Sequence, residues 1–418
     1  MKLQRMLLIY AIIIGILIVL VGCRTTHTAP AASPTPTPTS ELPPASPTPQ
    51  PPAHDQTMDV LTQMSLTEKI GQMVLVGMDG TAVQPEISSL IKERSVGGVI
   101  LYSNNVESAK QLSQLLNGLK QVNRDAKSKL PLLLSADQEG GRVSRLPKEI
   151  KAFPASMTVG STNDPKYAYR VGSALGEAMK MAGFNTDYAP VLDVNTNPNN
   201  PVIGDRAFGT TANRVTSMGV QEMLGIKSQG VIPVVKHFPG HGDTSVDSHY
   251  GLPVVEHDLQ RLRTTEFVPF ASAIQKGAPV VMVAHILMTK LDPNTPASMS
   301  RIIIQDFLRG ELNFGGVVIS DDMTMEAVGK TIAIGPAAVK AVMAGADIVL
   351  VGHDPEQQKA VLDALTAAVQ SGKIPQTTID ASVTRIAKLK SDFHLSDQPT
   401  APADVHKVNQ LIEAALKK

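Results

Sequence analysis

The chain has 418 residues, with one cysteine, no tryptophan, and 38 lysine and arginine residues balanced by 38 aspartate and glutamate residues. A formal net charge of zero gives no concentrated basic face, so we expect no nucleic-acid partner. One cysteine excludes an intramolecular disulfide. A hydrophobic content of 43% is ordinary for a globular protein, and the length alone would hold roughly two to three average domains or one large barrel.

Residues 1–22 predict export as a signal peptide. Lys2 and Arg5 precede an apolar run from Leu7 to Val21 that is short for a membrane-spanning helix. The run leads into Leu-Val-Gly and then Cys23, which resembles the lipobox of bacterial lipoproteins. The resemblance implies cleavage before Cys23, a lipid on its thiol, and an extracytoplasmic, membrane-anchored protein. An uncleaved N-terminal anchor is the alternative, and it also places the rest of the chain outside the cytoplasm.

A Pro/Thr-rich linker is predicted over residues 23–56. Its alternation of proline with threonine, as in residues 33–39, cannot form a helix or a central strand. Such a segment stays extended and acts as a spacer. We therefore expect a folded domain over 57–394 and a C-terminal tail with a short helix over 395–418.

The folded region alternates between short apolar runs and amphipathic stretches of helical period. The apolar runs, each a candidate strand, are Met73–Gly77, Gly98–Tyr102, Leu132–Ala136, Phe184–Leu192, Ile232–Lys236, Val280–Ala284, Val317–Ser320 and Ile348–Val351. The predicted helices are Ala109–Lys120, Tyr167–Met181, Arg214–Gln229, Asp258–Gln275, Arg301–Glu311, Glu356–Val369 and Thr378–Phe393, after a capping box at Ser65–Glu68. Apolar strands alternating with helices predict an α/β fold with a parallel sheet.

A single (β/α)8 TIM-type barrel accounts best for this alternation. An open doubly wound sheet is the other candidate, but it normally has a glycine-rich phosphate turn after its first strand. Residues 73–80 contain no such turn. In a barrel, active-site residues lie at the carboxyl ends of the strands and in the loops that follow, so the polar residues there are candidates for the site.

Two carboxylates follow apolar strands directly. Asp137 directly follows the predicted strand at 132–136, and Asp321 directly follows the apolar run Gly316–Ser320. A carboxylate at such a position is costly to bury without a partner or a function. Asp321 could attack an electrophilic carbon or balance positive charge, whereas Asp322 could equally cap the helical turn that follows.

Residues 237–249 contain three histidines and two aspartates. Their spacing lacks the helical context of zincin motifs, and the glycines and proline between them favour a loop, so we expect no metal. Asp247 and His249 are better interpreted as a dyad, in which the carboxylate orients the imidazole for proton transfer. The alternative is an exposed loop histidine.

Four basic residues are candidates for holding a ligand. Lys236 stands near a strand end, where an aldolase-type lyase would place a Schiff-base lysine, but it could equally donate hydrogen bonds, together with His237, to hydroxyl groups. Arg145 and Arg206 lie in polar loops and could clamp an oxygen-rich ligand or be ordinary surface arginines.

Taken together, these residues resemble the β-N-acetylhexosaminidases of glycoside hydrolase family 3. The most specific motifs are Asp137-Gln138-Glu139-Gly140-Gly141-Arg142-Val143, Lys236-His237-Phe238-Pro239-Gly240-His241-Gly242 with Asp247-Ser248-His249, and Ile319-Ser320-Asp321-Asp322-Met323. The resemblance covers about Thr57 to Phe393. It implies a retaining enzyme with a (β/α)8 barrel that removes terminal β-linked N-acetylglucosamine, notably from peptidoglycan fragments or chitooligosaccharides.

The resemblance also implies a role for each matching residue. Asp321 becomes the nucleophile, His249 the acid/base and Asp247 its dyad partner. Asp137, Arg145, Arg206, Lys236 and His237 hold the sugar. No cofactor is expected. Exported members of the family often carry a second domain after the barrel, and this chain is expected to lack it.

Other functions remain open from the sequence. Within the family, a β-glucosidase and a phosphorylase are the alternatives, and a phosphorylase would replace water by phosphate in the second displacement. A non-catalytic solute-binding lipoprotein would not need the Asp247/His249 pair. The partners expected are therefore a carbohydrate substrate and, through Cys23, the membrane, with the protein itself a monomer.

Overall fold

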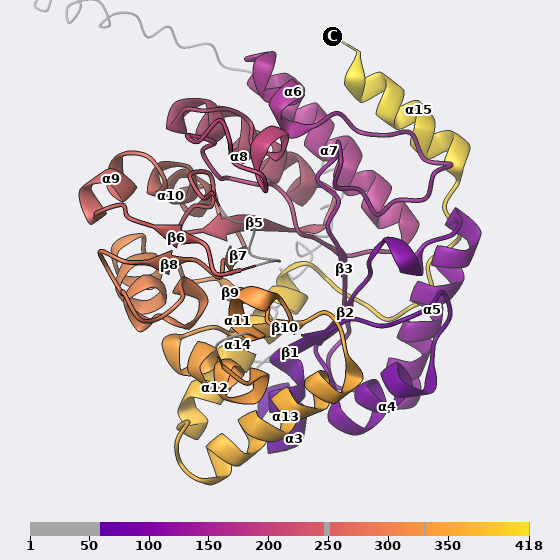
Figure 1. The fold of residues 1–418 in the computed structure, drawn as a ribbon. Helices are drawn as coiled ribbons and strands as arrows, with labels where there is room; N and C mark the ends of the chain where they lie inside the picture. The colour runs from indigo at the N-terminus through magenta and orange to yellow at the C-terminus, as the bar shows by residue number, and fades with distance from the viewer. Residues whose placement is uncertain (1–58, 246–250, 330–331, 418) are drawn as a thin grey trace, which may run out of the picture. The chain divides into compact units, whose positions relative to one another are not determined.

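The computed structural model describes residues 59–245, 251–329 and 332–417, and within them the chain forms a closed parallel barrel (Figure 1). Its strands are β1 (Val74–Val76), β2 (Gly98–Ile100), β3 (Leu133–Ala136), β4 (Thr186–Asp187), β5 (Ile232–Phe238), β7 (Val280–Val283), β9 (Val317–Asp322) and β10 (Ile348–Val351). Each strand pairs with its neighbours in chain order, and β1 closes the ring by pairing with β10. The predicted barrel is confirmed, and every barrel strand begins within a predicted apolar run.

Helices cover the outside of the barrel (Figure 1). They are α3 (Leu66–Gln72), α4 (Pro85–Arg94), α5 (Ala109–Asp125), α6 (Ser156–Ser161), α7 (Pro165–Ala182), α8 (Ala212–Ser228), α9 (Leu259–Thr264), α10 (Phe267–Gln275), the π-helix Ile302–Glu311, α12 (Ile334–Ala344), α13 (Pro355–Gln370) and α14 (Gln376–Asp392). The short helix α11 (Glu326–Gly329) lies instead at the mouth of the barrel. The predicted capping box is present at α3, where the Ser65 N–H donates to Glu68 Oε2 at 2.7 Å and the Glu68 N–H donates to Ser65 Oγ at 3.2 Å. Because the helices bury one face of the sheet and the barrel closes on the other, all residues of the barrel strands except the last two of β9 are buried.

Apart from helices α4, α6, α11 and α12, which are not among the predicted helices, the structure differs from the predicted elements at two places. The helix predicted over Asp258–Gln275 is interrupted between α9 and α10. Pro269 lies in the first turn of α10, where its ring would clash with the carbonyl of Thr265 in a continuous helix. The second difference is a small parallel sheet outside the barrel, formed by β6 (Val254–Val255) and β8 (Leu287–Met288), which the sequence analysis did not predict.

The C-terminal segment ends in helix α15 (Val405–Leu416), which packs against α7 (Figure 1). Val408, Ile412 and Ala415 form its buried face. Asn409 fixes the helix to the loop before α6, because its side chain accepts from the Lys151 N–H at 2.8 Å and donates to the Glu149 carbonyl at 2.9 Å. The helix therefore extends the outer layer of the barrel.

Several predictions fall on residues outside the described part of the chain. These are the signal peptide at 1–22, the lipid attachment at Cys23, the whole linker predicted over 23–56, and the Asp247/His249 dyad. Among the described residues, every helix is too short or too polar to span a bilayer.

Candidate active site

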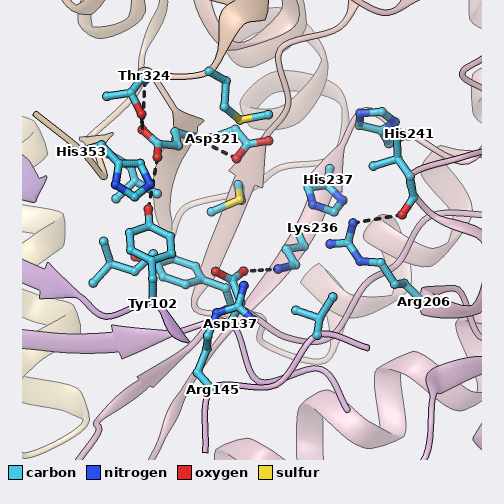
Figure 2. A pocket seen from close by; sticks show the side chains of 18 of the residues that line it. Tyr102, Asp137, Arg145, Arg206, Lys236, His237, His241, Asp321, Thr324 and His353 are labelled. Carbon is cyan, nitrogen blue, oxygen red and sulfur yellow. Dashed lines mark hydrogen bonds and ion pairs between the residues drawn. The ribbon is translucent and has the colours of Figure 1, made fainter. Parts of the chain in front are cut away.

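A pocket opens at the carboxyl ends of the barrel strands and brings together the predicted site residues that the structure describes. Its lining includes Asp137, Arg145, Arg206, Lys236, His237 and Asp321. Asp137 directly follows β3, Lys236 and His237 lie in β5, and Asp321 lies in β9. Because all barrel strands are parallel, their carboxyl ends meet at one rim, and residues far apart in sequence converge there. Figure 2 shows these side chains pointing into one cavity.

The Lys236 side chain is buried between two carboxylates. Its Nζ lies 2.5 Å from Asp137 Oδ1 and 2.7 Å from Glu139 Oε1, and its side chain is only 2% exposed (Figure 2). Burial alone would lower the pKa of Lys236, but Asp137 and Glu139 hold it above its ordinary value. A Schiff-base lysine must be a neutral amine to attack a carbonyl. The arrangement therefore disfavours the lyase alternative and makes Lys236 a cationic hydrogen-bond donor.

Glu139 joins Lys236 to Arg206. The guanidinium of Arg206 donates from Nε and NH2 to the two oxygens of Glu139, each at 2.7 Å. Burial would raise the pKa of Glu139, yet Lys236 and Arg206 hold it well below its usual range. Arg206 is thus a fixed bidentate partner of the site and not an ordinary surface arginine.

A glycine turn after Glu139 directs the chain back toward the pocket. Gly140 and Gly141 have φ of +89° and +56°, and a Cβ at Gly140 would lie 2.4 Å from the Pro154 carbonyl oxygen. Only glycine fits this turn without strain. After it, the Arg145 N–H donates to Gln138 Oε1 at 2.8 Å, which sets Arg145 at the pocket wall.

His237 is oriented by Asp193. Nδ1 of His237 lies 2.7 Å from Asp193 Oδ2, and Asp193 Oδ1 accepts from the backbone N–H of His241 at 2.7 Å. Burial would raise the pKa of Asp193, but the neighbouring histidines and these hydrogen bonds lower it. An ionised Asp193 accepts the Nδ1 proton of His237, which leaves Nε2 as the other polar atom of the ring, and the ring itself lines the pocket.

His241 is a further histidine of the pocket that the sequence analysis did not assign to the site. Burial, together with the charge of His237, lowers the pKa of His241 to about 4, so its ring is neutral at physiological pH. Thr244 Oγ1 donates to the His241 carbonyl at 3.0 Å and lies 2.6 Å from His241 Nδ1. The ring is therefore held as the Nδ1–H tautomer.

Asp321 and Asp322 have different surroundings, which separates their functions. Burial would raise the pKa of Asp321, but His237, His285 and the backbone N–H of Asp322, which donates at 2.9 Å, lower it. Asp322 accepts from Thr324, from the Gly352 N–H at 2.9 Å and from the Tyr102 hydroxyl at 3.1 Å. Asp322 thus connects strand ends, and Asp321 is the ionised carboxylate left to meet a ligand (Figure 2).

Three residues of this site were not singled out by sequence reasoning. Glu139 stood inside a quoted motif without a role, Asp193 stood in a polar stretch after the fourth strand, and His241 was considered only as a metal ligand. Nothing near Asp193 in the sequence indicates its role, because the residues that it contacts, His237 and His241, lie 44 and 48 residues away. Within the described residues, no group of three His, Cys, Asp or Glu side chains is placed to hold a metal ion.

Comparison with known proteins assigns the chain to an enzyme family. Residues 65–389 match the glycosyl hydrolase family 3 N terminal domain. The chain belongs to glycosyl hydrolase family 3. The family therefore agrees with the resemblance drawn from the three motifs.

Individual relatives are similar over most of this chain. Beta-hexosaminidase A of Pseudoalteromonas piscicida is 36% identical over 346 residues, which are 78% of this chain and 58% of that protein. Beta-hexosaminidase LpqI of Mycobacterium tuberculosis is 33% identical over 334 residues, 78% of this chain and 83% of LpqI. This chain thus spans less than two thirds of the Pseudoalteromonas protein.

Solved structures of family 3 proteins are similar to this chain as well. A glycoside hydrolase family 3 beta-N-acetylglucosaminidase from Paenibacillus sp. str. FPU-7 superposes with a TM-score of 0.79 at 41% identity, over 84% of this chain and 68% of that one. The structure of LpqI from Mycobacterium tuberculosis superposes with a TM-score of 0.72 at 31% identity, over 80% of this chain and 96% of that one. The family 3 assignment therefore rests on sequence and fold together.

Replacing Glu139 tests the buried charge cluster. Glu139→Gln should destabilise the protein at pH 7 by roughly 3 kcal/mol, because it removes a carboxylate from two buried cations. The pKa of Glu139 is depressed in the folded state, so its contribution is present at neutral pH and is lost as the pH falls. The difference in unfolding free energy between wild type and variant should shrink below about pH 4.3, by up to about 1.4 kcal/mol per pH unit.

Urea unfolding between pH 3 and 8 measures this difference. Glu311→Gln provides the control, since Glu311 pairs with Arg263 at the surface, and it should change the unfolding free energy by less than about 1 kcal/mol. A difference between wild type and Glu139→Gln that stays constant over the whole pH range would show that Glu139 is not held as a carboxylate by its neighbours.

Proposed function

We propose that this protein is a retaining exo-β-N-acetylglucosaminidase acting on peptidoglycan fragments or chitooligosaccharides. The observation that carries the proposal is Asp321, an ionised carboxylate in the same pocket as a fixed group of cationic donors. The names of the relatives, beta-hexosaminidase and beta-N-acetylglucosaminidase, support the same activity. A retaining glycosidase needs such a carboxylate to attack the anomeric carbon.

The part of the pocket around Lys236, Arg206 and Asp137 suits the hydroxyl groups of one sugar residue. Sugar hydroxyls both donate and accept hydrogen bonds, and Lys236 and Arg206 supply donors while Asp137 supplies an acceptor. The Lys236 ammonium has three N–H groups, and Asp137 and Glu139 lie within bonding distance of only two of them. Among the described residues no other acceptor bonds the ammonium, so the third N–H is available to a substrate oxygen. A grip of this kind recognises hydroxyl positions without needing a tryptophan, which the chain lacks.

In the proposed reaction, Asp321 attacks the anomeric carbon and the glycosidic bond to the leaving oxygen breaks. His249 protonates that oxygen as it departs, with Asp247 orienting its ring. Water then adds to the anomeric carbon, its proton passes to His249, and the bond to Asp321 breaks. Most retaining glycosidases use a second carboxyl for the proton transfers; a histidine near its ordinary pKa can both give and take a proton near pH 6 to 7.

Asp321→Asn tests the activity and the nucleophile together. The amide cannot form the glycosyl ester, so release of p-nitrophenol from the aryl β-N-acetylglucosaminide should fall by at least about 10³-fold. The wild type should release N-acetylglucosamine from chitobiose, with products identified by mass with and without phosphate. Near-normal turnover by Asp321→Asn would refute the assignment, and a sugar phosphate product would identify a phosphorylase.

His249→Ala tests the acid/base proposal. Loss of the proton donor should slow substrates with poor leaving groups far more than activated aryl ones, because only the former need protonation. We expect kcat/KM to fall by roughly 10²-fold or more on chitobiose and clearly less on the dinitrophenyl glycoside. Equal losses on the two substrates would count against the role of His249.

A further inference from the structure

A stacked pair of rings forms part of the pocket wall away from the Lys236 cluster. Tyr102 follows β2 and His353 follows β10, and both line the pocket that contains Asp321. Their ring centroids are 4.6 Å apart and their planes differ by 24°, a stacked arrangement. Figure 2 shows the two rings together on the side of the pocket away from Arg206.

The stack is held rigidly from three strand ends. The Tyr102 hydroxyl donates to Asp322 Oδ2 at 3.1 Å, and the Tyr102 N–H donates to Asn105 Oδ1 at 2.8 Å. The N–H of Gly352 donates to Asp322 Oδ1 at 2.9 Å, which fixes the backbone next to His353. A Cβ at position 352 would lie 1.9 Å from the Tyr102 hydroxyl oxygen, so glycine is required for this close approach.

The chemistry of this wall differs from that of the charged one. The same pocket lining also includes Ile100, Leu350 and Met325, which are apolar and buried. His353 itself is exposed, whereas Lys236 is 1% exposed. The pocket therefore has two different regions. One is buried and charged and suits hydroxyl groups, and the other is an exposed aromatic surface that is not part of the Lys236 cluster.

We propose that the His353 ring, supported by Tyr102, is the platform on which the sugar ring of the leaving group packs. This proposal rests on the proposed function and deepens it. A β-linked pyranose carries its hydroxyls around its edge and C–H groups on its faces, so one face can bury apolar area against an aromatic ring. In this proposal the hydroxyls of the sugar that is removed contact the buried charged region. The exposed His353 ring then contacts the leaving-group sugar, which extends toward solvent.

A comparison of two substrates tests the platform. Chitobiose has a sugar leaving group, whereas N-acetyl-β-glucosaminyl fluoride has a single atom that cannot reach a platform. For His353→Ala we expect kcat/KM on chitobiose to fall by about 3- to 10-fold. The loss on the fluoride should be less than about twofold, since only the platform contact is removed. His353→Phe keeps a flat ring and should restore most of the activity on chitobiose.

Each other outcome has a definite meaning. Equal losses on both substrates would place the ring against the sugar that is removed, and would overturn the proposal. So would unchanged activity of His353→Ala on chitobiose, or a His353→Phe variant as poor as His353→Ala. A wild type that hydrolyses neither substrate would refute the proposed function itself, a result visible before any variant is made.

Discussion

The buried ion pairs of Lys236 are the constraint on which the rest of the pocket depends. Two cations, Lys236 and Arg206, and two carboxylates, Asp137 and Glu139, lie together with little exposure to solvent. Burying a single charge costs several kcal/mol, so such a group persists only when its charges balance and its hydrogen bonds are made. The cluster contains two charges of each sign. Its members come from β5, the loop after β3 and the loop after β4, so the cluster also fixes those loops relative to one another.

The pairing of buried charges in the pocket also explains why the Asp321 carboxylate is available for chemistry. Asp137 and Glu139 are engaged by Lys236, Asp193 by His237, and Asp322 by Tyr102, Thr324 and Gly352. The pKa of Asp321 is lowered by its electrostatic interactions with His237, His285 and the Lys236 cation and by one backbone N–H, which keeps the carboxylate ionised. Nearby positive charge stabilises a carboxylate without consuming it in a close ion pair. Among the described residues, one oxygen of Asp321 accepts from the Asp322 N–H and neither oxygen lies in a close ion pair, so this carboxylate can meet a ligand.

Much of the fold could be predicted from the sequence because its signals are local. The apolar runs at the eight barrel strands and the capping box at Ser65 need only neighbouring residues to be recognised. The strand ends then identified Asp137, Lys236 and Asp321 as site candidates.

The features that the sequence did not show depend on partners far along the chain. Glu139 is defined by Arg206, 67 residues away, Asp193 by His237, and the difference between Asp321 and Asp322 by Tyr102, 220 residues from Asp322. The break between α9 and α10 was visible at Pro269, but the helical periodicity on either side outweighed it.

The proposed retaining reaction requires Asp321 to form a covalent bond to the anomeric carbon. The most direct measurement treats the protein with a 5-fluoro analogue of N-acetylglucosaminyl fluoride, whose glycosyl ester hydrolyses slowly, and then maps the labelled peptide by mass spectrometry. The role of Asp321 as nucleophile predicts one added sugar per chain, located on its carboxylate. A label on Asp322 or Asp137, or steady turnover with no label and an inverted product, would contradict it.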